Sequence, residues 1–401
     1  MANRKLACVD DYRAAAKRRL SRLAFDYLEG GSEGGGALRR NCDAYAQWLL
    51  RPRVLTDVSY CSTSTSLWDR EIAAPMVVGP TGLNGLFWPK ADEMLARAAA
   101  DAGLPFVLST ASTSLLESVR AAVPDGELWL QLYVQQDRRI AEDMMRRAGA
   151  AGFSTLVLTV DTPVHGIRDH DVRNGFQLPL RPSARLIADC IAHPRWSWQM
   201  LAHGSPQLVN IARSVGEAAN LMRHAAILSR QMDLTLGWSD IGWIRRHWRG
   251  KVLVKGILTV EDALLARDAG ADGIVLSNHG GRQLESAPTS MDVLPGVAKA
   301  VGGDLRIFVD GGIRRGADVV KAIALGASAT LLGRAPLYGV AACGKSGVDD
   351  VLRILKAEMS TTMRLMGCRN IEGLTPVSVE SLPLRSARQA ETLAETPVRL
   401  A

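Results

Sequence analysis

The sequence repeats one local pattern, in which a glycine that ends a helix is followed at once by a short apolar strand. Four such junctions stand at 102–103, 151–152, 269–270 and 325–326, each before an apolar run. Glycine suits the left-handed position just past a helix, and strands buried on both faces of a parallel sheet are apolar throughout. The repetition therefore predicts helix and strand units stacked around a parallel sheet.

Completing the pattern gives eight strand candidates, at 76–79, 105–110, 128–133, 155–161, 252–256, 273–278, 306–311 and 329–333. The helices expected between them include 92–102, 137–150, 260–269, 291–301 and 316–325. Eight alternations of this kind predict an α/β fold, a (β/α)8 TIM barrel, whose active site lies at the carboxyl ends of the strands.

Three segments lie outside the expected barrel repeat. Residues 1–70, beginning with a helix over Asp10 to Leu20, are expected to form an N-terminal helical cap on the barrel. The barrel itself is expected over 71–375, with a long insertion at 175–235 after the fourth strand. Insertions of this length are usually functional or mobile. Residues 376–401 are expected to form a C-terminal tail, poorly ordered from Pro383 onward.

The composition argues against several other classes of protein. The net charge of +7 comes from scattered residues without a Lys/Arg block, so nucleic acid is not expected as a partner. Six dispersed cysteines without a C-x-x-C pair predict no metal site and no disulfide framework, and reduced thiols fit a cytoplasmic setting. The beginning of the chain lacks a signal-peptide pattern, and no run approaches about 18 apolar residues, so we expect neither secretion nor a membrane span.

Polar or glycine residues follow every expected barrel strand. Because the carboxyl ends of barrel strands meet at one mouth, these side chains should gather into a single site. In strand order they are Thr81; Ser109 and Thr110; Gln131 and Tyr133; Thr159 and Asp161; Lys255; Ser277 and His279; Asp310; Gly333 and Arg334.

A histidine and an arginine leave the sixth strand together, in the run Ser277-Asn278-His279-Gly280-Gly281-Arg282. Histidine titrates near neutral pH, arginine can clamp a carboxylate with two donors, and glycines let the backbone approach a flat ligand. The pattern predicts a base beside an anion clamp. A loop histidine with ordinary turn glycines is the alternative.

The loops after the seventh and eighth strands read Asp310-Gly311-Gly312-Ile313-Arg314 and Leu332-Gly333-Arg334. Barrels that bind phosphate commonly do so at this position, with backbone amides and a helix start. Helix caps with surface arginines are the alternative reading. A phosphate site, a strand-end lysine and a base beside an arginine together suggest flavin mononucleotide (FMN) with an acid substrate on its ring.

These motifs, with Ser277 to Leu284 foremost, resemble the FMN-dependent α-hydroxy-acid oxidising family, which includes glycolate oxidase and lactate dehydrogenase. The resemblance spans about residues 8 to 375. It extends through 26–31, Gly79-Pro80-Thr81-Gly82, Leu108-Ser109-Thr110, Gln131-Leu132-Tyr133, Thr159-Val160-Asp161 and Val254-Lys255-Gly256.

The resemblance implies a role for each catalytic and substrate-binding residue. His279 would be the active-site base, with Asp161 stabilising its imidazolium form. Arg282 and Arg168 would hold the substrate carboxylate. The remaining implied residues are Tyr27 at the carboxylate, Tyr133 at the hydroxyl, and Lys255 as positive charge near the N1 edge of the flavin.

The resemblance also implies which residues bind FMN. For Ser109, Gln131 and Thr159 the alternative is local hydrogen bonding at the barrel mouth. The implied FMN-binding residues are Pro80, Thr81, Gly82, Ser109, Gln131, Thr159, Lys255, Ser277, Asp310, Gly312, Arg314, Gly333 and Arg334.

Within the family, the tracts 80–90 and His193-Pro194-Arg195-Trp196-Ser197 resemble members that oxidise mandelate. Gly82 stands where glycolate oxidases usually carry alanine, which favours a dehydrogenase. The expected reaction is oxidation of (S)-mandelate, or a close aryl analogue, to the 2-keto acid, with electrons passed to a membrane quinone-type acceptor. The alternatives are a soluble oxidase of lactate, glycolate or hydroxymandelate that produces hydrogen peroxide, and a decarboxylating monooxygenase. An FMN-binding barrel without redox turnover and a phosphate-binding isomerase are further alternatives, and the set of His279, Arg282 and Arg168 argues against both.

The insertion carries an amphipathic basic segment at 181–215. It has four arginines (Arg181, Arg185, Arg195 and Arg213), one acidic residue (Asp189), and tryptophans at 196 and 198. Such a segment fits either an anionic membrane surface or a soluble lid whose aromatic residues pack on the barrel. The resemblance favours the membrane, and implies a peripheral protein on the cytoplasmic face of the inner membrane that assembles as a homotetramer.

Overall fold

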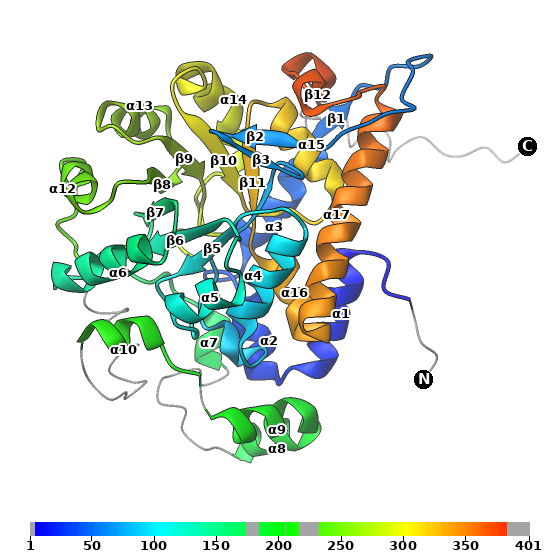
Figure 1. Cartoon of the computed structure of the whole chain (residues 1–401). Coiled ribbons are helices and arrows are strands. Elements are labelled where there is room, and N and C mark those ends of the chain that lie inside the picture. The colour runs from blue at the N-terminus through cyan, green and yellow to red at the C-terminus, as the bar shows by residue number, and fades with distance from the viewer. Residues whose placement is uncertain (1–4, 174–183, 205, 216–231, 383–401) are drawn as a thin grey trace, which may run out of the picture.

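The computed structural model describes residues 5–173, 184–204, 206–215 and 232–382 (Figure 1). Eight parallel strands close into a barrel in the order β10-β11-β4-β5-β6-β7-β8-β9. Their bounds are β4 Met76–Val78, β5 Phe106–Ser109, β6 Leu128–Leu132, β7 Thr155–Thr159, β8 Lys251–Ile257, β9 Gly273–Leu276, β10 Arg306–Asp310 and β11 Ala329–Leu332. The predicted (β/α)8 fold is confirmed.

Each predicted strand coincides with one barrel strand, and the differences lie at the strand ends. The strand predicted at 155–161 ends at Thr159, and the one predicted at 128–133 ends at Leu132. Polar residues such as Asp161 and Tyr133 leave the hydrogen-bonded ladder and enter the mouth, so their side chains are available to a site.

The helices that cover the barrel are α4 Ala91–Asp101, α5 Leu116–Ala122, α6 Arg138–Ala150, α12 Asp240–His247, α13 Val260–Asp268, α14 Ser290–Val301, α15 Gly316–Ala324 and α16 Arg334–Cys343. The five helices predicted from the sequence are confirmed to within one residue at each end. The longest helix, α17 Lys345–Leu365, was not predicted, and it packs against α16, α15 and α4.

A short hairpin closes the amino end of the barrel. It consists of β2 Thr65–Leu67 and β3 Arg70–Ile72, and Trp68 at its turn lies against Trp129 and Phe308 inside the barrel. The ring centroids of Trp129 and Phe308 are 5.7 Å apart in an edge-to-face arrangement. The amino end is thus plugged by aromatic packing, which leaves the carboxyl end as the open mouth.

The N-terminal segment contributes α1 Val9–Arg19, α2 Arg22–Glu29, α3 Gly36–Asp43, η1 Ala44–Gln47 and β1 Trp48–Leu50. Strand β1 pairs with β12 Val379–Ser381, so the described part of the predicted tail folds back onto this segment. Residues 383–401 lie outside the described residues. Shorter 3-10 turns occur at η2 Asn84–Leu86, η3 Ile371–Gly373 and η4 Pro376–Ser378.

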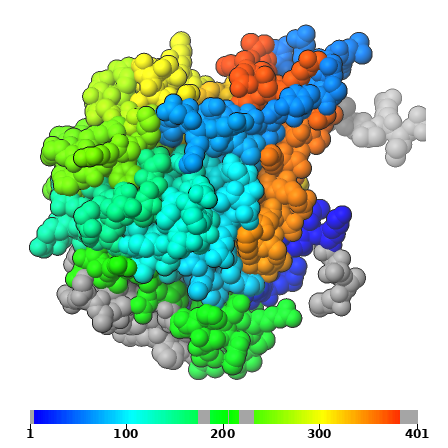
Figure 2. All heavy atoms as spheres, in the orientation of Figure 1, coloured from blue at the N-terminus to red at the C-terminus, as the bar shows by residue number. Residues whose placement is uncertain are grey.

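The described parts of the insertion lie at the mouth end of the barrel, beyond α7 Asp169–Arg173 (Figure 1). They are α8 Ala184–Ala192, α9 Pro194–His203 and α10 Val209–Val215. Helices α8 and α9 form the lower edge of the molecule in Figure 2. Within the described residues, none of the helices is long and apolar enough to cross a membrane. Arg181 and the rest of 174–183 lie outside the described residues.

Candidate active site

A cavity of about 710 Å³ opens at the carboxyl ends of the barrel strands. Nearly all of the predicted site residues line it, which brings together side chains from every barrel strand and from α2. Those that line it are Tyr27, Pro80, Thr81, Gly82, Ser109, Gln131, Tyr133, Thr159, Arg168, Lys255, His279, Arg282, Asp310, Gly312, Arg314, Gly333 and Arg334. Asp161 and Ser277 stand one contact behind the cavity wall, through His279 and Lys255.

The buried ammonium of Lys255 is the electrostatic centre of the mouth. Its Nζ donates to Ser277 Oγ at 2.8 Å and lies 3.2 Å from Asp310 Oδ2 and 3.9 Å from Asp161 Oδ2. Burial lowers the pKa of Lys255, but the two carboxylates outweigh burial and raise this pKa to about 12. Lys255 therefore keeps its charge across the physiological range.

His279 is oriented by Asp161. Its Nδ1 lies 2.8 Å from Asp161 Oδ1, and because a carboxylate only accepts hydrogen bonds, Nδ1 carries the proton. Burial raises the pKa of Asp161, but the charges of His279 and Lys255 reverse this and lower it. The other ring nitrogen, Nε2, lies 3.3 Å from the Tyr133 hydroxyl, at the cavity. A neutral His279 is therefore set up to accept a proton at Nε2.

The Tyr133 hydroxyl remains a hydrogen-bond donor. Burial, and next the Asp161 carboxylate, raise the pKa of Tyr133 to about 12. A protonated phenol beside His279 can orient a substrate oxygen without competing for the proton that the histidine takes.

The loop that carries His279 has an unusual backbone. His279, Gly280 and Gly281 have φ angles of 58°, 62° and 75°, and a side chain at Gly281 would overlap the backbone of α3. A left-handed histidine is uncommon and costs energy unless its surroundings hold it. Ser277 Oγ helps to hold it by accepting from His279 N at 2.9 Å.

A buried amide pair fixes the same loop from α3. Asn41 Nδ2 donates to Asn278 Oδ1 at 2.7 Å, and Asn278 Nδ2 donates to Asn41 Oδ1 at 2.8 Å. The Asn41 backbone also lies so close to Gly312 that a side chain at that glycine would overlap its carbonyl. The packing of α3 therefore requires glycine at position 312, whether or not a ligand also requires it. Asn41 leaves no local signal in the sequence, because its partner is 237 residues away.

Two partly buried arginines bind the carboxyl end of α2. Arg282 Nη1 donates to the carbonyls of Tyr27 and Gly30 at 2.9 and 2.8 Å, and Arg334 Nη2 donates to the same Gly30 carbonyl at 2.8 Å. These contacts satisfy carbonyls that a helix end leaves unpaired. Burial, and next the charge of Arg168, lower the pKa of Arg282 to about 9. An anion in the cavity would stabilise the charged form of Arg282 and raise this pKa again.

Arg168 also has capacity for a ligand. Its guanidinium is 3.7 Å from Asp171, and its Nε is buried without a hydrogen-bond partner in the described part of the chain. Together, Arg168 and Arg282 place two cations at the cavity, which suits a small carboxylate.

The barrel-mouth side chains fit a flavin nucleotide. Ser109 Oγ donates to Gln131 Oε1 and Gln131 Nε2 donates to Thr159 Oγ1, both at 3.0 Å, so the local bonding expected as the alternative does occur. Asp310 lines the cavity, however, and its Oδ1 is buried with no hydrogen-bond partner among the described residues. A ligand rich in hydroxyl groups, such as a ribityl chain, would satisfy it.

The loop after β10 places Arg314 at the cavity beside two glycines. Gly311 and Gly312 have φ angles of 90° and 80°, and the guanidinium of Arg314 lies 5.5 Å from the Tyr338 ring. Gly82 lies on the loop after β4, the strand next to β11, and a Cβ there would lie 2.8 Å from the Ala111 Cβ. Among the described residues, no group of three His, Cys, Asp or Glu side chains could hold a metal ion.

One wall of the cavity is apolar and was not predicted from the sequence. It includes side chains of the β4 and β5 loops, of α7 and of the insertion, namely Leu83, Phe87, Ala111, Val172, Leu208 and Met232. The apolar residues of the insertion follow no periodic pattern that would have singled out Leu208 and Met232.

Comparison with known proteins identifies the family of the chain. Residues 16–381 match the family of FMN-dependent dehydrogenases. The chain is 47% identical over 368 residues to (S)-mandelate dehydrogenase of Pseudomonas putida, covering 92% of each chain. It is 42% identical over 376 residues to L-lactate dehydrogenase of Pectobacterium atrosepticum, covering 94% of this chain and 97% of that one.

A crystal structure of the monotopic membrane protein (S)-mandelate dehydrogenase superposes with a TM-score of 0.91 at 46% identity, covering 94% of this chain and all of the other. The chain belongs to the FMN-dependent dehydrogenase family, whose members here are 2-hydroxy-acid dehydrogenases, oxidoreductases that act on a CH-OH group. Its cofactor is FMN, as the sequence predicted.

Replacement of Lys255 by methionine tests the electrostatic centre. The variant should lose about 3–5 kcal/mol of unfolding free energy at neutral pH, because Asp161 and Asp310 would be buried without their cation. In the wild type the lowered pKa of Asp161 gives stability that is complete above its unfolded pKa and is lost as the pH falls through the folded value. Without Lys255, burial would move this pKa upward.

The stability deficit of Lys255→Met should therefore shrink as the pH falls from about 8 to about 5, measured by urea denaturation. Lys251→Met is the matched control, since Lys251 also lies on β8 but pairs with Asp272 at the surface, 3.6 Å away. A stability deficit that is equal at both pH values, or equal in Lys251→Met, would contradict the role of Lys255 as the cation that balances Asp161 and Asp310.

Proposed function

We propose that the protein oxidises an (S)-2-hydroxy acid, with (S)-mandelate or a close aryl analogue as its preferred substrate, to the 2-keto acid. The observation that carries the proposal is the Asp161–His279 pair, placed at a cavity that is lined both by two arginines and by an apolar wall. The apolar wall supports an aryl substrate over lactate, because a phenyl ring would cover surface that a methyl group leaves exposed.

Each proposed role follows from a contact at the cavity. Arg282 and Arg168 would bind the substrate carboxylate, with Tyr27 at their side, because these residues line the cavity together. Tyr133 would donate to the substrate hydroxyl, and His279 Nε2 would accept one proton. Asp161 would stabilise the imidazolium that results. FMN, when bound, supplies the ring that accepts the two electrons, and Lys255 would hold positive charge next to it.

The remaining FMN contacts are proposed from their positions in the cavity. The backbone of Pro80, Thr81 and Gly82, together with Ser109, Gln131 and Thr159, would line the ring. Ser277 would act through Lys255, and the ribityl chain and phosphate would be bound by Asp310, Gly312, Arg314, Gly333 and Arg334.

We also propose that α8 and α9 bind the protein reversibly to an anionic membrane surface and pass electrons to a quinone-type acceptor there. Their outward face carries Ile187, Ile191, Trp198 and Leu201, of which the last three are 74%, 71% and 79% exposed. Trp196 instead packs inward, with its Nε1 donating to Leu86 O at 2.8 Å. The packed-lid alternative thus describes Trp196, and the membrane reading is supported by the other residues and by the monotopic relative. A cytoplasmic, inner-membrane location and a homotetramer are part of the proposal.

Anaerobic titration tests the reaction. One equivalent of (S)-mandelate should bleach the flavin absorbance of the purified protein, and L-lactate and glycolate should bleach it more slowly. Reoxidation by a soluble quinone analogue should be faster than reoxidation by air. No bleaching by any 2-hydroxy acid would overturn the proposal, whereas rapid peroxide formation in air would replace the dehydrogenase by an oxidase.

Variants of His279 and of the two arginines test the assigned roles. His279→Ala should keep its flavin but lose about 10²-fold to 10⁴-fold in kcat. Arg282→Met should lose about 1.5–3 kcal/mol in kcat/KM through the carboxylate clamp. Because Arg282 also binds the Tyr27 and Gly30 carbonyls, Arg168→Met is the companion variant, and flavin content is measured for all three. Near-normal kinetics in His279→Ala would refute the base assignment.

Membrane binding is tested with vesicles. The triple variant Ile191→Ser, Trp198→Ser and Leu201→Ser should bind anionic phospholipid vesicles at least tenfold more weakly, because each buried apolar side chain contributes on the order of 1 kcal/mol or more. The double variant Leu365→Ser and Val377→Ser, at positions that are 73% and 74% exposed elsewhere, is the control. If the wild type does not sediment with vesicles at low salt, the membrane proposal fails.

A further inference from the structure

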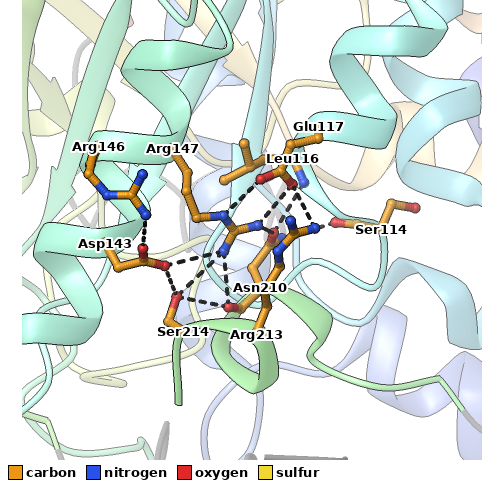
Figure 3. A network of polar contacts seen from close by, with 9 residues as sticks. All are labelled: Ser114, Leu116, Glu117, Asp143, Arg146, Arg147, Asn210, Arg213 and Ser214. Atoms are coloured by element: carbon orange, nitrogen blue, oxygen red, sulfur yellow. Dashed lines mark hydrogen bonds and ion pairs between the residues drawn. The ribbon is translucent and has the colours of Figure 1, made fainter. Parts of the chain in front are cut away.

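Helix α10 is too short to be stable on its own. It has seven residues, Val209–Val215, whereas isolated helices shorter than about 12–15 residues are marginal in water. Its position must therefore come from tertiary contacts. Figure 3 shows these contacts, which join α10 to α5 and α6 of the barrel.

The central residue of the contacts is Asn210, which is fully buried. Its Oδ1 accepts from Leu116 N at 3.1 Å and from Arg147 Nη2 at 3.2 Å, while its Nδ2 donates to Ser114 O at 2.9 Å. One amide thus satisfies backbone groups at the start of α5 and a side chain of α6. Loss of the amide would leave these buried groups unpaired, at about 1–3 kcal/mol each.

Arg147 completes the arrangement. It is buried, and its Nε and Nη2 donate to the two carboxylate oxygens of Glu117 at 2.8 and 2.9 Å. The hydrogen bond to Arg147 is the main reason that the pKa of Glu117 is lowered. We call Asn210, Arg147 and Glu117 the clasp. Glu117 neutralises the charge of Arg147, and the two parallel hydrogen bonds between them fix the orientation of the guanidinium.

The clasp stands two residues from the cavity wall. Leu208 is 2% exposed and lines the cavity, and it packs with Ile140 and Ile211 beside Leu83 and Ala111. Leu83 follows Gly82 directly, on the loop that approaches the proposed flavin site. The place of Leu208 in the wall is therefore set by how α10 is held.

We propose that the clasp is a positioning device for substrate selection, which keeps Leu208 against the side chain of the 2-hydroxy acid. The inference rests on the proposed function, because it concerns the substrate of that same site. Asn210 is a positioning residue that acts through Leu208. Arg282 and His279 lie on the loop after β9, and Arg168 stands just before α7, outside the clasp, so a displaced α10 penalises large apolar side chains selectively.

Asn210→Leu tests the clasp, since leucine has a similar size but cannot form the three hydrogen bonds. The variant should lose about tenfold to hundredfold in kcat/KM for (S)-mandelate, chiefly through KM, with a much smaller loss for L-lactate. A second readout without turnover is the affinity of phenylacetate compared with acetate, measured by the flavin absorbance change. The affinity of the variant for phenylacetate should fall, whereas its affinity for acetate should stay the same.

Three further variants guard the interpretation. Leu208→Ala should cause the same selective loss with the clasp intact, and combining it with Asn210→Leu should add little, because both act on one contact. Asn210→Asp keeps the acceptor for Leu116 N and Arg147, so it should recover part of the selectivity. Arg146→Gln is the control, because Arg146 pairs with Asp143 at the exposed edge of the network. It should change kcat/KM for neither (S)-mandelate nor L-lactate.

Equal losses for mandelate and lactate, or additive effects of Asn210→Leu and Leu208→Ala, would overturn the proposal. If the wild type oxidises no 2-hydroxy acid, the proposed function fails instead. The comparison of phenylacetate and acetate binding would still report on the clasp.

Discussion

The buried ammonium of Lys255 is the interaction on which the mouth of the barrel depends. It joins groups from four adjacent strands, because Asp161 follows β7, Lys255 lies on β8, Ser277 follows β9 and Asp310 ends β10. A buried cation is costly unless its partners are well placed, and here two carboxylates and a hydroxyl surround it. A shift of any one of these strands would lengthen a contact of Lys255 and leave a charged group without its partner.

The orientation of His279 follows from this arrangement. Asp161 contacts Lys255 with one oxygen and His279 with the other, and Ser277 accepts from both Lys255 Nζ and His279 N. The lysine therefore fixes both partners of the proposed base. This explains how a histidine can be held at a left-handed φ of 58°, a conformation that it would not adopt unsupported.

The barrel alone does not complete the site, and this limits what the sequence could predict. The strands and strand-end residues were predictable because continuous apolar runs and the polar residues that follow them are local signals. The reciprocal pair of Asn41 and Asn278, and the Gly30 carbonyl that Arg282 and Arg334 share, are contacts across more than 200 residues of sequence, and neither leaves a local pattern. Likewise, composition could not separate Trp196, which packs inward, from Trp198, which faces outward.

The insertion has two different surfaces on one continuous segment. Helices α8 and α9 present apolar side chains outward, whereas Leu208, just before α10, lines the cavity and Ile211 of α10 is buried beside it. All three lie at the mouth end of the barrel (Figure 1). A protein resting on a membrane through α8 and α9 would therefore turn its cavity mouth toward the bilayer, where a lipid-soluble acceptor would have a short path to the flavin. Because the clasp anchors α10 to the barrel, contact of α8 and α9 with lipid need not displace the cavity wall.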